Sequence, residues 1–348
     1  MSKTYLFSAV LIIFAGLMQL QPINAQNNDH DTESKKAFNQ AVTSLKTNDI
    51  NNALALLNKA LELNPDFITA YTERGKIYLY QNKLKEANAD FEKAIHLNSE
   101  SGEAYYGMAY IQFLNKDFEK ALIGLNTSIS KGYNEYIAYY HRGIINLMKN
   151  DATAALLDFT YCLDKRNTFY QAWHDRGSAK FLLKDFSGAI SDYEKAIELK
   201  PDFALAYANL GSVKKEMGDF QVAINAFTKS ITADSFQSVV WNKRGVAKYL
   251  SGDLEGAKYD FEYALKSNPK YLYSINNQAV IYAKEERHSD ALNSMNLVIG
   301  GQPQKGEYYL NRGYVKELSG DLDGACADWH MADSLNIQEA KIYLKDCK

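Results

Sequence analysis

Hydrophobic and small residues recur along this chain at helical spacing, in pairs of segments that repeat every 34 residues. Numbered from Ser34, the positions that keep their character are 4, 8 and 11, and then 20, 24 and 27. Residues three or four apart share one face of a helix, so each set predicts an amphipathic helix. Asp, Asn and Gly between the two sets favour a tight turn. Each window therefore predicts a helical hairpin.

The period holds for nine windows, from Ser34 to Glu339, without an insertion or deletion. Position 20 is always alanine: Ala53, Ala87, Ala121, Ala155, Ala189, Ala223, Ala257, Ala291 and Ala325. Position 24 is always large: Leu57, Phe91, Leu125, Phe159, Tyr193, Phe227, Phe261, Met295 and Trp329. The predicted repeats are 34–67, 68–101, 102–135, 136–169, 170–203, 204–237, 238–271, 272–305 and 306–339.

Position 8 is glycine in six windows and alanine in the other three. Glycine inside a helix costs about 1 kcal/mol relative to alanine, so its recurrence indicates that no side chain fits there. Simple antiparallel alignment predicts that position 8 faces the alanine at position 20, and that position 4 faces position 24. Proline at position 32 ends the second helix in four windows, at Pro65, Pro201, Pro269 and Pro303.

This pattern resembles the tetratricopeptide repeat family, whose unit is a 34-residue helix–turn–helix. The resemblance covers residues 34–339 and implies an all-α, right-handed solenoid in which the first helix of each repeat lines a concave groove. One hairpin cannot bury its apolar face alone, so stacked neighbours build the core and the ends need caps. We expect residues 340–348 to form the C-terminal cap.

Arginine at position 7 and aspartate at position 23 occur together in five windows and are absent together from the other four. Joint presence indicates a direct pair across the hairpin, and a catalytic role would not need five copies. We interpret these residues as structural ion pairs: Arg74–Asp90, Arg142–Asp158, Arg176–Asp192, Arg244–Asp260 and Arg312–Asp328.

Composition supports an ordered protein and excludes several partners. The chain has 348 residues, 46% of them hydrophobic, and no Ser/Gly/Pro-rich linker divides it. A formal net charge of −3, without a long run of like charges, argues against nucleic acid and against polybasic membrane targeting.

The N-terminus is typical of a secretory signal peptide. Lys3 precedes an apolar run, and Pro22 and the small Ala25 precede a polar stretch. We expect a signal peptide at residues 1–25 and a polar linker at 26–33, and hence an exported protein, periplasmic or secreted, without stable membrane insertion. An uncleaved membrane anchor is the alternative.

Three cysteines occur, an odd number for an exported chain. Cys162 stands at position 27 and is expected to pack as a small side chain. If the segment after residue 339 folds back, Cys326 and Cys347 meet, and we predict a disulfide between them. A similar Gly-Ala-Cys…Cys ending is seen in exported bacterial proteins of the family. Two unpaired thiols are the alternative.

The sequence carries no recognisable catalytic, nucleotide-binding or metal-binding motif. His141 and His174 stand at neighbouring positions of adjacent windows, and with Asp175 they could form a metal site. We favour the interpretation that they are polar residues of the groove. We therefore expect no enzyme activity, cofactor or metal.

The groove is the candidate site. In the family, positions 2, 5, 6, 9, 12 and 13 contact ligands, and the basic set that captures acidic C-termini is missing here. Aromatic and amide side chains at or beside these positions, together with one isoleucine, are the candidate peptide-binding residues: Tyr106, Tyr110, Tyr140, Ile144, His174, Asn209, Asn242, Asn277 and Asn311. Asn39, Asn209, Asn277 and Asn311 at position 6 resemble an incomplete version of the asparagine ladder by which some members of the family hold peptide backbones.

We therefore predict a non-enzymatic scaffold that binds a peptide segment or an envelope protein in this groove. The alternative is a structural component acting by self-association or through its convex face. The sequence leaves the partner and the oligomeric state open.

Overall fold

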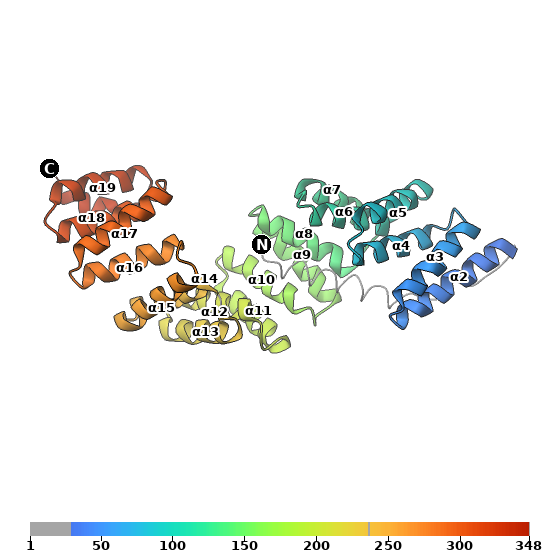
Figure 1. Cartoon of the computed structure of the whole chain (residues 1–348), viewed down its shortest axis with the longest axis horizontal. Coiled ribbons are helices and arrows are strands. Elements are labelled where there is room, and N and C mark those ends of the chain that lie inside the picture. The colour runs from blue at the N-terminus through green and yellow to red at the C-terminus, as the bar shows by residue number, and fades with distance from the viewer. Residues whose placement is uncertain (1–28, 236, 348) are drawn as a thin grey trace. The chain divides into compact units, whose positions relative to one another are not determined.

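The computed structural model describes residues 29–235 and 237–347, so the predicted signal peptide lies outside the described part of the chain. Every regular element in these residues is a helix (Figure 1), as predicted. They form two compact units, one ending at Leu183 and the other beginning at Lys184. None of the described helices is long and apolar enough to span a bilayer.

The first unit is a stack of helical hairpins in which consecutive helices pack against each other. Its helices are α2 (Asp29–Lys46), α3 (Ile50–Leu63), α4 (Ile68–Tyr80), α5 (Leu84–Leu97), α6 (Gly102–Leu114), α7 (Phe118–Ser130), α8 (Tyr136–Met148), α9 (Ala152–Lys165) and α10 (Tyr170–Leu182). Helix α2 begins at Asp29 and so takes in most of the segment 26–33 that was expected to be a linker.

The second unit repeats the same arrangement. Its helices are α11 (Phe186–Leu199), α12 (Ala204–Glu216), α13 (Phe220–Ala233), α14 (Ser238–Leu250), α15 (Leu254–Ser267), α16 (Leu272–Lys284), α17 (His288–Gly301), α18 (Gly306–Leu318) and α19 (Leu322–Ser334). The short helix α20 (Ala340–Tyr343) and the 3₁₀ turn η1 (Leu344–Asp346) pack on α19 at the C-terminus.

Each hairpin turns at position 15, where the backbone adopts a positive φ. The residues there are Asn48, Asn82, Lys116, Asn150, Lys184, Gly218, Gly252, Glu286 and Gly320. Position 16 is usually aspartate, and except at Asp219 its carboxylate caps the second helix. Asp117, for example, accepts a hydrogen bond from the backbone N–H of Lys120.

The prediction that position 8 faces position 20 was wrong. A Cβ added at Gly245 would lie 2.6 Å from the ring of Phe261, at position 24 of the same repeat. The aromatic at position 4 packs on position 26 instead, as where Trp241 stacks on Tyr263 at 4.0 Å between centroids. The pairs of positions 4 with 26 and 7 with 23 place the midpoint of the hairpin at position 15, whereas the alignment assumed position 14. That midpoint brings position 22 opposite position 8, and the ring at position 24 reaches the glycine from two residues further along the second helix.

Candidate functional site

Four of the five predicted ion pairs have both members in the same unit, two pairs in each unit, and the structure brings the members of all four into contact. Arg74 donates from Nε and Nη2 to the two carboxylate oxygens of Asp90, at 2.8 and 2.7 Å. The other three are Arg142–Asp158, Arg244–Asp260 and Arg312–Asp328. Arg176 belongs to the first unit and Asp192 to the second, so that pair stays a prediction.

The surroundings of these pairs explain why the arginine is needed. Burial raises the pKa of Asp90, and the hydrogen bonds from Arg74 oppose that shift. The guanidinium also lies over the aromatic ring at position 4, as with Arg244 above Trp241 at 4.6 Å. The pairs hold the two helices of a hairpin together and present no free reactive group.

The C-terminal cap is tied to the last hairpin. Cys326 on α19 and Cys347 form a disulfide, with an S–S distance of 1.97 Å. Tyr343 on α20 stacks on Trp329 at 5.0 Å, so the cap covers the indole at position 24. Cys162 is a buried free thiol on α9, and burial raises its pKa.

The predicted groove residues of the first unit are linked by hydrogen bonds between successive first helices. The hydroxyl of Tyr106 on α6 lies 3.2 Å from Nδ1 of His141 on α8. Tyr140 on α8 donates to Asp175 on α10 at 2.9 Å, and Asp175 also binds Nδ1 of His174 at 2.8 Å. Burial lowers the pKa of His141 to about 3, so its imidazole is neutral at pH 7.

The second unit uses amides for the same links. Asn311 donates from Nδ2 to Oδ1 of Asn276 at 3.1 Å, and Asn277 donates to Oδ1 of Asn242 at 2.9 Å. Asn276 donates to Asn277, and Ser274 donates to Asn242, so the amides form one connected chain. In both units, position 5 of one repeat binds position 6 of the next. We call these linked residues at positions 5 and 6, taken within each unit, the groove ladder.

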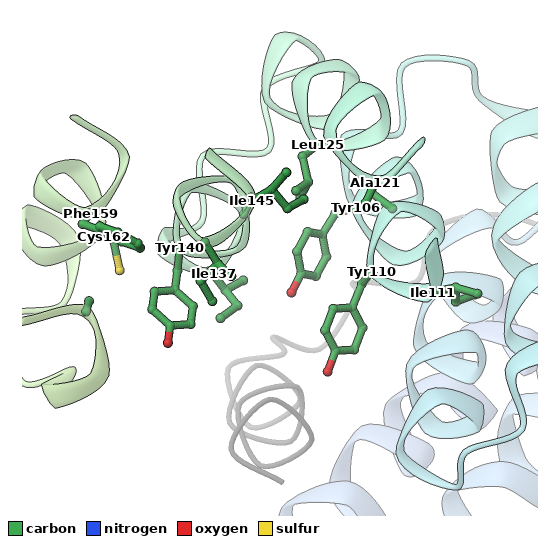
Figure 2. Close-up of a cluster of buried hydrophobic side chains, with 14 of the residues drawn as sticks. Tyr106, Tyr110, Ile111, Ala121, Leu125, Ile137, Tyr140, Ile145, Phe159 and Cys162 are labelled. Carbon is green, nitrogen blue, oxygen red and sulfur yellow. The ribbon is translucent and has the colours of Figure 1, made fainter. Parts of the chain in front are cut away.

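Most predicted groove residues are buried. Tyr106, Tyr110, Tyr140, Ile144, His174 and Asn242 are buried, whereas Asn209, Asn277 and Asn311 are partly exposed. Figure 2 shows Tyr106, Tyr110 and Tyr140 in a hydrophobic cluster with their hydroxyls on the same side. The hydroxyl of Tyr110 has no hydrogen-bond partner among the described residues.

Sequence reasoning listed both members of the Asn242–Asn277 link, but in the other three links it missed the partners of Tyr106, Tyr140 and Asn311, namely His141, Asp175 and Asn276. The sequence signal for these links is a pair of polar residues 35 positions apart, which is one residue more than the 34-residue repeat. It also missed a charged cluster of Glu73, Lys76 and Glu103, in which Lys76 binds both carboxylates. Within residues 29–235 and 237–347, no group of three His, Cys, Asp or Glu is placed to hold a metal ion.

Family models match several parts of the chain. One, described as TPR repeat, matches residues 43–81 and 177–232, and another, described as Tetratricopeptide repeat, matches residues 72–129. A search of curated proteins finds no match.

Solved structures with the same fold cover most of the chain. A tetratricopeptide repeat protein from Parabacteroides merdae has a TM-score of 0.59 at 18% identity, covering 71% of this chain and 98% of its own. The C-terminal part of a TPR repeat-containing protein from Cytophaga hutchinsonii gives 0.51 at 20% identity, covering 69% and 99%. A chain of the APC/C hetero-tetramer Cut9-Hcn1 gives 0.60 at 14% identity, covering 97% and 81%. At these identities the likeness establishes the fold alone.

Proposed function

Because this chain is a tetratricopeptide repeat protein, a fold that serves as a scaffold for binding proteins or peptides, we propose that it binds a peptide segment along its groove ladder. The observation that carries the proposal is the linked side chains on successive first helices of each unit, aromatic in the first unit and amide in the second. Amides both donate and accept hydrogen bonds, which suits a peptide backbone, and aromatic rings suit apolar side chains.

Two ladder atoms support this assignment. Asn242 uses its Oδ1 as an acceptor, and Asn311 uses its Nδ2 as a donor. The Nδ2 of Asn242 and the Oδ1 of Asn311 have no hydrogen-bond partner among the described residues, so the amide chain ends in one free donor and one free acceptor. An extended peptide supplies both complementary groups.

A rival surface lies on the second helices. Ile123 on α7 and Leu157 on α9 both occupy position 22 of their repeats and are 67% and 68% exposed. Exposed apolar residues at one repeat position favour docking on the convex side or self-association. We keep this as the second candidate function.

One capture experiment separates the two surfaces. The wild-type chain, immobilised and exposed to envelope extract of its own cells, is compared with Asn242→Ala/Asn277→Ala/Asn311→Ala and with Ile123→Asn/Leu157→Asn. We expect the partner to be lost by the first variant and retained by the second. The reverse result would move the site to the convex side. Melting curves of both variants confirm that they are folded.

We also propose that the protein is exported to the periplasm or secreted. The apolar N-terminal segment and the Cys326–Cys347 disulfide support this, since disulfides persist in oxidising compartments. Cell fractionation with mass spectrometry of the mature N-terminus tests it. A chain found intact in the cytoplasm would contradict it.

A further inference from the structure

A compact charged cluster lies on two neighbouring first helices of the first unit. Glu73 and Lys76 stand on α4, and Glu103 stands on α6. The ammonium of Lys76 binds Glu73 at 2.7 Å and also binds Glu103. Two carboxylates therefore share one cation, which leaves the cluster with one net negative charge.

Glu73 is only half satisfied. Its side chain is 1% exposed, and one carboxylate oxygen, Oε1, accepts a hydrogen bond from Lys76. The other, Oε2, is buried and has no partner among the described residues. Desolvation raises the pKa of Glu73 to about 6. A buried carboxylate oxygen without a donor is costly, so a donor supplied by a ligand would relieve that cost.

An aromatic wall continues from this cluster. A Cβ added at Gly102, the residue before Glu103, would lie 3.0 Å from the Cβ of Tyr133, so this tyrosine stands beside the cluster. Burial raises the pKa of Tyr133, the carboxylates of Glu103 and Glu73 add to that shift, and Lys76 opposes it. The ring of Tyr133 stacks on Tyr106 at 5.1 Å, and Tyr106 stacks on Tyr110 at 6.1 Å. Figure 2 shows the hydroxyls of Tyr106 and Tyr110 on one side, and that of Tyr110, like Oε2 of Glu73, is buried without a partner among the described residues.

We propose that Glu73, Glu103 and Tyr133 form a subsite for a basic side chain of the bound peptide. This rests on the proposed function and names the chemistry of the ligand. A guanidinium fits best, because it is planar, stacks on a tyrosine ring and donates several hydrogen bonds in one plane. The free oxygen of Glu73 is the acceptor, and the net negative charge of the cluster selects a cation over a neutral donor.

The test is a random-peptide selection on the chain as processed by the cell, with Glu73→Gln and a control, Glu119→Gln. Glu119 lies on α7 and its side chain is 74% exposed, so this control removes the same charge outside the cluster. From the selected peptides, one arginine peptide and its citrulline counterpart, which has the same shape without the charge, are measured by calorimetry.

We expect the wild type and Glu119→Gln to select a basic residue at a fixed place among apolar ones, and to bind the arginine peptide about tenfold more tightly than the citrulline peptide. In Glu73→Gln the affinity for the arginine peptide should be about the same as that for the citrulline peptide, while the selection still returns the same pattern of apolar residues. That retained pattern shows that the variant is folded.

Peptides selected without a basic residue, or an arginine preference that survives in Glu73→Gln, would overturn the subsite and leave the proposed function intact. If none of the three proteins selects a peptide, the proposed function fails, and the subsite fails with it.

Discussion

The Nη1 atom of Arg74 donates a hydrogen bond to Oδ1 of Asn58 at 2.8 Å, and this contact joins two successive hairpins. Asn58 stands at position 25 on α3, in the repeat that precedes Arg74. The same guanidinium holds Asp90 through Nε and Nη2. Arg74 therefore links the two helices of its own hairpin and also links this hairpin to the preceding one.

The bridge recurs wherever the structure describes an arginine pair. The other bridges are Arg142–Asn126 at 3.0 Å, Arg244–Thr228 at 3.0 Å and Arg312–Asn296 at 2.7 Å. Where the next repeat lacks the arginine, position 25 is glutamate instead, at Glu92, Glu194 and Glu262. Position 25 thus varies together with positions 7 and 23, and the three form one structural unit.

Removing Arg74 should strand a buried charge. Asp90 is 4% exposed, so we expect Arg74→Leu to lower the free energy of unfolding by roughly 3 kcal/mol. The double variant Arg74→Leu/Asp90→Leu should recover a large part of that loss, because no charge is left unpaired. Chemical denaturation of the wild type, both single variants and the double variant measures the coupling, and simple additivity would refute the pairing.

The joint between hairpins can be tested separately. Asn58→Ala removes a hydrogen bond to a charged group and should cost about 1–2 kcal/mol. Hydrogen exchange should rise mainly at α3 and α4, on the two sides of the joint. Asn51→Ala, on the exposed face of α3, is the control and should leave exchange unchanged. Equal effects of the two substitutions would mean that the bridge does not stabilise the joint.

How much of this could be predicted from sequence depends on distance along the chain. The Arg74–Asp90 pairing lies within one hairpin and was visible as joint presence and absence. Its partner Asn58 lies in the preceding hairpin, and that contact depends on how hairpins stack, which the repeat length alone does not specify. The ladder link between Tyr106 and His141 was missed for the same reason.

The burial of Tyr106 and Tyr140 could not be predicted either. Position 5 can face a ligand or pack against the next repeat, and the angle between hairpins decides between the two. The misplaced partner of Gly245 has a simpler cause. A shift of one residue in the turn moves the expected partner of each position by two, and the long ring of Phe261 covers the remaining two positions.

Gly245 should not tolerate a methyl group. In an ordinary helix, glycine to alanine stabilises by about 1 kcal/mol. At Gly245 the new Cβ would meet Phe261 at 2.6 Å, so we expect Gly245→Ala to destabilise by about 1–3 kcal/mol. Gly300, on α17, has no neighbour within 4 Å of a built Cβ, and Gly300→Ala should be neutral or stabilising. In thermal melts, the melting temperature should therefore fall in Gly245→Ala and stay the same or rise in Gly300→Ala.

The disulfide should stabilise the C-terminal cap. Cys326 and Cys347 are 21 residues apart, and closing a loop of that size contributes roughly 3 kcal/mol. Dithiothreitol should lower the melting temperature of the wild type and leave Cys326→Ser/Cys347→Ser unaffected. Thiol titration gives an independent check, because the unfolded, unreduced chain should expose one thiol, that of Cys162. Three thiols would contradict the disulfide.

Glu73 and His141 should give the stability opposite dependences on pH. Burial lowers the pKa of His141 from 6.5 to about 3, so below pH 6.5 the unfolded chain binds a proton that the native state does not. Between pH 6.5 and about 3, the contribution of His141 to the free energy of unfolding therefore falls by about 1.4 kcal/mol for each pH unit. The pKa of Glu73 is raised from 4.5 to about 6, so between these values the native state binds the extra proton. The contribution of Glu73 to the free energy of unfolding therefore rises as the pH falls from 6 to 4.5.

Denaturation at pH 7.5 and pH 5 separates the two groups. His141→Gln should reduce the loss of stability on acidification, and Glu73→Gln should increase it, each relative to the wild type at the same pH. Because the comparison uses the change between two pH values, a constant cost of either substitution cancels. Equal acid sensitivity in all three proteins would mean that neither side chain is desolvated in the native state. The subsite would then lose the buried carboxylate on which it depends.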